Sequence, residues 1–206
     1  MKNIEFYIFR HGQTDWNRLK KVQGNTDIPL NDLGRKEAQS LREFFSSINI
    51  DRVFTSDLLR AHETAEIVFE NRSVSIQKSP ELREANFGEV EGMHIDELLS
   101  RFSTKFWDIH KGGPEADTFS YPGGETRGEV RERLISFIDK IRVESSTSSV
   151  ALSTHGGALR SIMHHYLPNE AELVKIPNCV VYKISFNGDD FQVEGPFNNE
   201  KDLCYN

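Results

Sequence analysis

Two short apolar runs of the sequence each end in a histidine. The first run, residues 6–9, leads into Arg10 and His11, and the second, residues 150–153, leads through a threonine to His155. Runs of this length are typical of buried β-strands, and open α/β sheets bind ligands outside the carboxyl ends of their strands. Two imidazoles and a guanidinium at such an edge would attract an anion, and a neutral imidazole is also a nucleophile.

A phosphate monoester is one anion on which these groups can do chemistry. Arg10 and Arg60 supply the planar, always charged forks that bind phosphoryl oxygens, with His155 as a further donor. Arg60 lies in the first turn of a predicted helix, whose N-terminal end favours negative charge. Either His11 or His155 can act as the nucleophile. The leaving group also needs a proton donor, for which a carboxylic acid is suitable. Spacing does not choose among the four glutamates of the acid loop, residues 81–92: Glu81, Glu84, Glu89 and Glu91.

Strands and helices alternate along most of the chain, which predicts a mostly parallel sheet covered on both faces. The expected fold is therefore a three-layer α/β/α architecture. Asn187 and Gly188 join the last two strands as a hairpin, so an antiparallel edge strand is expected. Asn31 and Ser56 are the expected N-caps of two helices. Strands are predicted at 4–9, 52–55, 74–77, 150–153, 180–186 and 191–194, and helices at 33–48, 57–69, 130–141 and 157–166.

A single domain over residues 1–206 is expected, with an insertion at about 85–124 that covers the site. Within this insertion the apolar spacing of residues 94–110 indicates a helix, and residues 111–124 are rich in glycine and proline. The aromatic residues of this stretch are expected to form a small core of their own.

The composition limits the class of protein. The net charge is −7 and charged residues make up 28% of the chain, which argues against nucleic-acid binding because that function usually needs a basic face. Cys179 and Cys204 have no metal-binding spacing and are expected to be free thiols. Neither a signal peptide nor a membrane span is apparent, so we expect a cytoplasmic protein without membrane partners. The sequence leaves the oligomeric state open: the terminal strands could form an edge for a homodimer, or could simply be covered.

Four segments resemble, in order, the motifs of the histidine phosphatase superfamily, which includes the cofactor-dependent phosphoglycerate mutases. The first resembles the Arg-His-Gly signature, the second the second-arginine helix, the third the loop of the catalytic acid, and the fourth the second-histidine motif. In this sequence they are Phe9–Thr14 with Asn17, Ser56–Ala61 with Thr64 and Ala65, Leu82–Glu84 with Phe87, Gly88, Glu91 and Gly92, and Ser153–Gly157.

The resemblance implies a role for each residue that the spacing left open. His11 would be the nucleophile that becomes phosphohistidine, and Glu84 would exchange protons with the leaving group and with water. Three residues would hold the phosphoryl group: Arg10, Arg60 and His155. Members of the family need no metal for this reaction, and we expect neither a metal nor another cofactor here. The positions that match substrate contacts of the family are Asn17, Gln23, Gly24 and Gly156.

Two departures from the family patterns favour hydrolysis over phosphoryl transfer to a second substrate. The mutase branch has Arg-His-Tyr-Gly after its acid, where this chain has residues 85–88 as Ala-Asn-Phe-Gly, and the chain is shorter than typical mutases. A third departure concerns the packing of the acid loop and not the reaction: the phosphatase branch often has tryptophan where Val90 stands.

We therefore expect a metal-independent, histidine acid-type phosphatase that acts on a small phosphomonoester. Its specificity could be that of an α-ribazole phosphatase, a phosphoserine phosphatase or a broad-specificity enzyme. The alternatives are a cofactor-dependent phosphoglycerate mutase, a module that binds a phosphorylated ligand without turnover, and a metal-dependent hydrolase.

Overall fold

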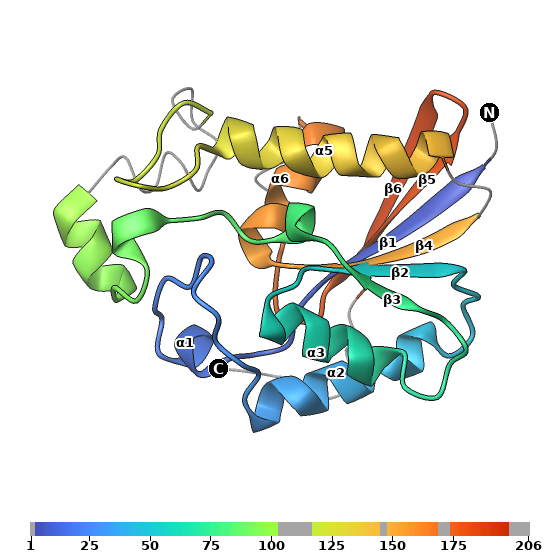
Figure 1. The fold of residues 1–206 in the computed structure, drawn as a ribbon, viewed down its shortest axis with the longest axis horizontal. Coiled ribbons are helices and arrows are strands. Elements are labelled where there is room, and N and C mark those ends of the chain that lie inside the picture. The colour runs from blue at the N-terminus through green and yellow to red at the C-terminus, as the bar shows by residue number, and fades with distance from the viewer. Residues whose placement is uncertain (1–2, 103–116, 145–147, 169–173, 198–206) are drawn as a thin grey trace.

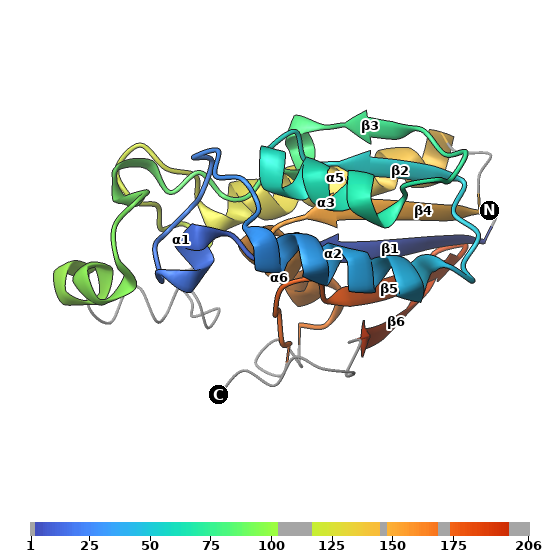
Figure 2. The ribbon, with the colours of Figure 1, turned by 90° about the horizontal axis from the view of Figure 1, so that it is seen from below.

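The computed structural model describes residues 3–102, 117–144, 148–168 and 174–197. Six strands form one mixed sheet in the order β3-β2-β4-β1-β5-β6, which Figure 2 shows from top to bottom behind two of the helices. The three pairings among β1 to β4 are parallel, whereas β5 pairs antiparallel with both β1 and β6. The strands are β1 (Ile4–Arg10), β2 (Arg52–Thr55), β3 (Ile76–Lys78), β4 (Ser149–Thr154), β5 (Val181–Asn187) and β6 (Asp190–Phe197).

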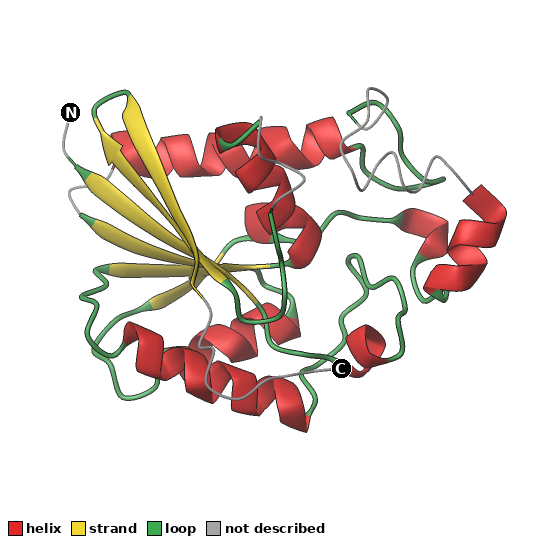
Figure 3. Ribbon diagram, turned by 180° about the vertical axis from the view of Figure 1, so that it is seen from behind, coloured by secondary structure: helices red, strands yellow, loops and turns green. Residues whose placement is uncertain are grey.

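Helices cover both faces of this sheet (Figures 1 and 3). Helices α2 (Asp32–Phe45) and α3 (Leu59–Val68) pack on one face, and α5 (Arg127–Glu144) and α6 (Gly156–Tyr166) pack on the other. Two separate apolar cores fill the spaces between the sheet and the two helical layers. The predicted three-layer α/β/α fold with an antiparallel edge pairing is confirmed.

The register of the two central strands explains why the two histidines meet. β1 and β4 are adjacent and parallel, and Arg10 lies opposite Thr154. Because both strands end at the same level, His11 and His155 leave the sheet side by side. Residues 6–9 are buried, and so is every residue of β4, which agrees with the apolar runs in the sequence.

One predicted cap is confirmed and the other is wrong. Asn31 caps α2, since its side chain accepts a hydrogen bond from the Gly34 amide. Ser56 does not cap α3: the helix begins at Leu59, two residues later than predicted, without a side-chain cap from its neighbours. The Leu59 amide instead donates to Asp27 Oδ1 at 2.7 Å. A partner that lies 32 residues earlier in the chain is invisible to a local capping rule.

Short elements lie near and beyond the carboxyl ends of β1, β2 and β4, most of them at the left of Figure 1 and η1 nearer its centre. They are α1 (Asp15–Arg18), η1 (Pro80–Leu82), η2 (Gly88–Val90) and a helical stretch at residues 95–102. Val90, Leu98 and Tyr121 form the centre of a third apolar cluster in this region. The rest of the helix predicted at 94–110 lies outside the described residues, as does Cys204. Cys179 is a free thiol. Within the described ranges, no helix is long and apolar enough to cross a membrane.

Candidate active site

The centre of the site is the pair of histidines at the ends of β1 and β4. The ring centroids of His11 and His155 lie 5.2 Å apart, and both side chains are buried. Hydrogen bonds at the Nδ1 atoms fix the tautomer of each neutral ring. His11 Nδ1 lies 2.7 Å from the Gly12 carbonyl oxygen. A carbonyl only accepts, so His11 Nδ1 carries the proton and Nε2 keeps its lone pair.

His155 has the opposite tautomer. Arg60 Nε lies 3.2 Å from His155 Nδ1. A guanidinium only donates, so this Nδ1 accepts and the proton of neutral His155 sits on Nε2. His155 Nε2 is buried and has no hydrogen-bond partner in the described part of the chain. One imidazole can thus act as a nucleophile and the other as a donor, a distinction that the spacing of the residues left open and that agrees with the roles the resemblance implies.

Both rings are held in the neutral state that these tautomers require. Burial is the largest cause: it lowers the pKa of His11 and of His155 well below 6.5. The nearby positive charges of Arg60 and Arg10 lower both pKa values further. A neutral imidazole can attack phosphorus, whereas an imidazolium cannot.

The same burial predicts that acid destabilises the fold. An unfolded histidine binds its proton near pH 6.5, whereas these two buried rings resist protonation until a lower pH. Their contribution to stability is therefore present above pH 6.5 and is lost as the pH falls below it, by up to about 1.4 kcal/mol per pH unit for each histidine. Urea unfolding at several pH values would measure this slope. His155→Gln should remove about half of the slope that the two histidines contribute to the pH dependence of the unfolding free energy. An unchanged slope would contradict this explanation.

Two arginines surround the histidine pair. Arg60 is completely buried, and donates to the carbonyl oxygens of Thr26 at 2.9 Å and Gly24 at 2.6 Å as well as to His155. Burial lowers its pKa to about 10, so it stays charged at neutral pH. Arg10 donates to the Ile176 carbonyl at 2.6 Å, and its buried Nε has no partner among the described residues.

The loop after β1 is fixed by close packing against α2 and α3. The Gly12 amide donates to Thr64 Oγ1 at 3.1 Å, and the Gln13 amide donates to the buried Glu37 carboxylate at 2.7 Å. A Cβ on Gly12 would lie 2.3 Å from the Gly34 carbonyl oxygen. Any larger residue at position 12 would therefore push the histidine loop away from α2.

The structure distinguishes among the four glutamates that the sequence offered as proton donors. Glu84 is buried and lines the cavity beside the histidines. Glu81 and Glu89 are exposed and do not line this cavity. Glu91 accepts from the amides of residues 25, 26 and 87 and holds that loop together.

The Glu84 carboxylate sits at the N-terminus of α6. Oε2 accepts from the Gly157 amide at 2.8 Å, and Oε1 accepts from the amides of Ala158 at 2.9 Å and Ala85 at 3.0 Å. A carboxylate oxygen has two lone pairs, so Oε2 keeps one for a proton or a substrate atom. A Cβ on Gly157 would lie 2.6 Å from Oε1, so only glycine allows this approach.

A cavity of about 350 Å³ opens over these groups. Every predicted site residue lines it except His155, which is buried in contact with Arg60 and His11. The predicted residues that line it are Arg10, His11, Asn17, Gln23, Gly24, Arg60, Glu84 and Gly156. Within the described ranges, no group of three or more His, Cys, Asp or Glu side chains is arranged to hold a metal ion.

The sequence did not indicate several residues of the outer cavity. Arg127 and Arg160 are half-buried cations at its wall, and Tyr121 contributes a buried hydroxyl group. Arg160 could have been identified, because it lies four residues after Gly156 and therefore on the same face of α6. Arg127 and Tyr121 had no comparable local signal.

The comparisons with known proteins agree with this geometry. A model of the histidine phosphatase superfamily (branch 1) matches residues 6–199. The chain is 29% identical to the uncharacterised phosphatase PhoE of Bacillus subtilis, over 91% of this chain and 91% of that protein. It is 30% identical to phosphoglycerate mutase-like protein 4 of Arabidopsis thaliana, over 92% of this chain and 83% of that protein.

Solved structures show the same fold. A mycobacterial glucosyl-3-phosphoglycerate phosphatase in complex with VO3 superposes with a TM-score of 0.84, over 93% of this chain and 97% of that chain. The two sequences are 22% identical, so this likeness concerns the fold alone.

Proposed function

The chain belongs to branch 1 of the histidine phosphatase superfamily, and on that premise we propose that it hydrolyses a small phosphomonoester through a phosphohistidine on His11. The observation that carries the proposal is the opposite tautomers of the two histidines. Gly12 holds His11 with its lone pair on Nε2, and Arg60 holds His155 with its proton on Nε2. The ring centroids of the two histidines lie 5.2 Å apart, so a nucleophile and a hydrogen-bond donor can act on the same phosphoryl group.

In the first step, His11 Nε2 attacks phosphorus and the bond from phosphorus to the leaving oxygen breaks. Glu84 in its protonated form gives its proton to that oxygen, so that a neutral alcohol departs. Arg10, Arg60 and the Nε2–H group of His155 bind the phosphoryl oxygens, over which negative charge is spread in the transition state.

In the second step, water attacks phosphorus and the bond from phosphorus to His11 Nε2 breaks. The Glu84 carboxylate accepts a proton from the water, which returns the acid to its starting state and releases inorganic phosphate. The atoms and charges of this cycle balance with the side chains of this chain, the ester and water.

We further propose that the part of the substrate beyond the phosphoryl group binds against the 85–124 insertion. The outer wall of the cavity includes Phe87, Ile95 and Phe119, together with the cations Arg127 and Arg160. This combination supports a leaving group that has apolar carbon atoms and at least one hydrogen-bond acceptor.

Tyr121 is the residue of this wall that we expect to affect selectivity. Its hydroxyl is buried, has no hydrogen-bond partner in the described part of the chain, and belongs to a residue that lines the cavity. Burial raises the pKa of Tyr121 to about 12, so the hydroxyl remains a neutral donor. Tyr121→Phe should lower kcat/KM for the best substrate about 2- to 10-fold, the worth of one hydrogen bond, and leave p-nitrophenyl phosphate almost unaffected.

The same variant should unfold at a higher denaturant concentration, because an unsatisfied buried hydroxyl is removed. Tyr7→Phe is the matched control, since the Tyr7 hydroxyl donates to Glu5 away from the cavity and should give neither effect. If Tyr121→Phe alters neither selectivity nor stability, this hydroxyl does not contact the substrate.

The proposed activity is tested by phosphate release from a panel of esters in the presence of a chelator. The panel contains p-nitrophenyl phosphate, phosphoserine, α-ribazole phosphate and 3-phosphoglycerate. We expect turnover that the chelator does not affect and a covalent phosphoenzyme that can be trapped on His11. Loss of turnover with the chelator would favour a metal-dependent hydrolase, and phosphopeptide binding without turnover would favour a binding module.

A phosphoglycerate mutase is the second candidate, since one relative described above is named mutase-like. A mutase would require a bisphosphorylated primer and would interconvert phosphoglycerates faster than it releases phosphate. We expect the reverse: release of phosphate without primer, and no faster isomerisation when primer is added.

A further inference from the structure

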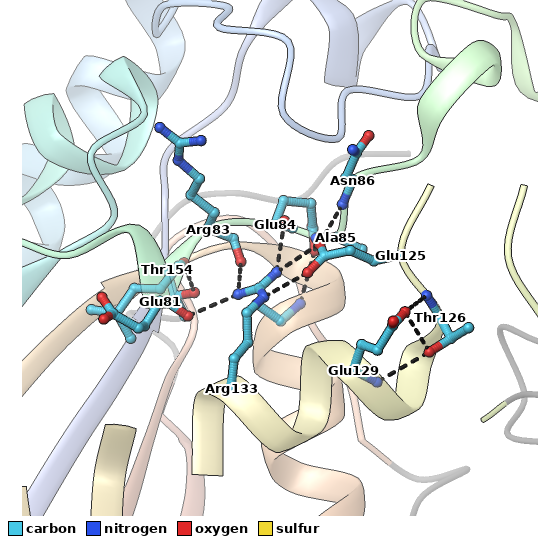
Figure 4. Close-up of polar contacts among 12 residues, drawn as sticks. Glu81, Arg83, Glu84, Ala85, Asn86, Glu125, Thr126, Glu129, Arg133 and Thr154 are labelled. Atoms are coloured by element: carbon cyan, nitrogen blue, oxygen red, sulfur yellow. Dashed lines mark hydrogen bonds and ion pairs between the residues drawn. The ribbon is translucent and has the colours of Figure 1, made fainter. Parts of the chain in front are cut away.

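Arg133 of α5 makes an unusual number of contacts with the loop that carries Glu84 (Figure 4). Its Nη1 atom donates to the carbonyl oxygens of Glu81 at 2.8 Å and Arg83 at 2.9 Å. Its Nη2 atom donates to the carbonyl oxygen of Glu84 itself at 3.0 Å. The planar guanidinium thus fixes three carbonyl groups of the acid loop in one geometry.

The fourth carbonyl group of residues 81–84, that of Leu82, is bound by a residue of the sheet and not by α5. Thr154 Oγ1 donates to the Leu82 carbonyl oxygen at 2.7 Å. Thr154 is the last residue of β4 and directly precedes His155. Residues 81–84 are therefore fixed between the strand that carries His155 and helix α5, with every carbonyl oxygen bound to a side chain.

Arg133 is also connected, through Glu125, to the backbone that follows Glu84. Its Nε and Nη2 atoms lie 2.9 and 3.1 Å from the two carboxylate oxygens of Glu125. Glu125 Oε2 accepts from the Asn86 amide at 2.8 Å, and the Glu125 amide donates back to the Asn86 carbonyl. The next residue, Thr126, forms a capping box with Glu129, which fixes the start of α5. These contacts hold the backbone on both sides of Glu84.

We propose that Arg133, with Glu125 as its relay, is the positioning residue for Glu84: it sets the distance of the acid from the leaving group without touching the substrate. This inference rests on the proposed function. General acid catalysis depends steeply on distance, because a displacement of 1 Å can cost about 10²-fold in rate. Without Arg133, the carbonyl oxygens of Glu81, Arg83 and Glu84 lose their donor, and Glu125 loses the guanidinium that holds its carboxylate against the Asn86 amide. The contacts of the Glu84 carboxylate with α6 and of Thr154 with the Leu82 carbonyl remain.

A purely structural role would give a different kinetic result from a positioning role. Nitrophenolate is a good leaving group that departs without a proton, whereas an alkoxide needs one. The kcat/KM value reports the first step, in which the leaving group departs. The informative quantity is therefore the ratio of kcat/KM for p-nitrophenyl phosphate to kcat/KM for the best alkyl phosphate of the panel. Both values come from one preparation, so the ratio is independent of the folded fraction.

We expect Arg133→Ala to lower kcat/KM for the alkyl phosphate about 10²-fold and that for p-nitrophenyl phosphate less than about fivefold. Arg133→Lys should change the ratio in the same direction and serves if the alanine variant does not fold. Arg131→Ala is the matched control: Arg131 lies two residues away on α5 and pairs with Asp117. The ratio for Arg131→Ala should equal that of the wild type.

A double-mutant cycle shows whether Arg133 acts through Glu84. In a Glu84→Gln background, Arg133→Ala should reduce kcat/KM for the alkyl phosphate by less than about threefold, because the acid is already lost. If Glu84→Gln raises the ratio and Arg133→Ala does not, or if the two effects multiply, the role of Arg133 is refuted while the proposed function stands. If Glu84→Gln itself leaves the ratio unchanged, the proposed assignment of the acid fails as well.

Discussion

Replacing His11 with alanine should lower phosphate release from p-nitrophenyl phosphate by about 10⁴-fold or more, because loss of a covalent nucleophile is rarely compensated. The ring of His155 cannot substitute for it. Arg60 holds the proton of His155 on Nε2, so this nitrogen has no lone pair to offer. Steady-state assays and mass spectrometry of the quenched enzyme measure the effect: the wild type should carry one phosphoryl group on His11, and the variant none.

His165→Ala is the matched control for this experiment. His165 lies on α6, is exposed and is not part of the cavity wall. We expect wild-type turnover and normal phosphoenzyme from this variant. Retained turnover in His11→Ala, together with loss of turnover in His155→Ala, would reverse the two histidine roles and contradict the tautomers described above.

The central part of the site was predictable from sequence because its signals are local. The apolar runs before His11 and His155 are buried strands, and a buried strand leaves little freedom in where its end lies. Two such strands that pair in parallel must bring their ends together. The meeting of the histidines follows from strand burial and pairing, and Arg60 follows from its place in the first turn of α3.

The supporting contacts were not predictable, since each joins segments that are distant in sequence. Glu84 differs from the other acidic-loop glutamates through its contacts with the start of α6, 73 and 74 residues later. Arg133 meets the acid loop 49 to 52 residues after it. Asp27 replaces the expected cap of α3. No periodicity or spacing rule relates such pairs, so only the packed structure identifies them.

In the proposed mechanism, Arg60 has three tasks that a lysine cannot combine. A guanidinium has five N–H groups, and three of them are used within the protein, by His155 Nδ1 and by the carbonyl oxygens of Thr26 and Gly24. The two that remain, one on each Nη atom, can form a bidentate pair with phosphoryl oxygens. Arg60 sets the tautomer of His155 and fixes the loop that carries Gln23 and Gly24, and in the proposed mechanism it also binds the anion.

Arg60→Lys should lower kcat/KM by about 10²- to 10³-fold for every substrate, since a preorganised donor to the transition state is lost. The variant should also be less stable, by about 1–3 kcal/mol for each buried carbonyl oxygen left without a donor. Inorganic phosphate, which should raise the melting temperature of the wild type by binding the folded state, should have much less effect on the variant.

Arg35→Lys is the control for this substitution. Arg35 lies on α2 and pairs with Glu63, which is on α3 like Arg60. This ion pair is partly exposed, and neither residue lines the cavity. Its replacement should preserve kcat/KM and the response to phosphate. If Arg60→Lys retains kcat/KM within about twofold, and if phosphate still raises its melting temperature, a single ammonium group suffices at this position. The bidentate contact and the control of the His155 tautomer would then be dispensable, and the anion would be held mainly by Arg10.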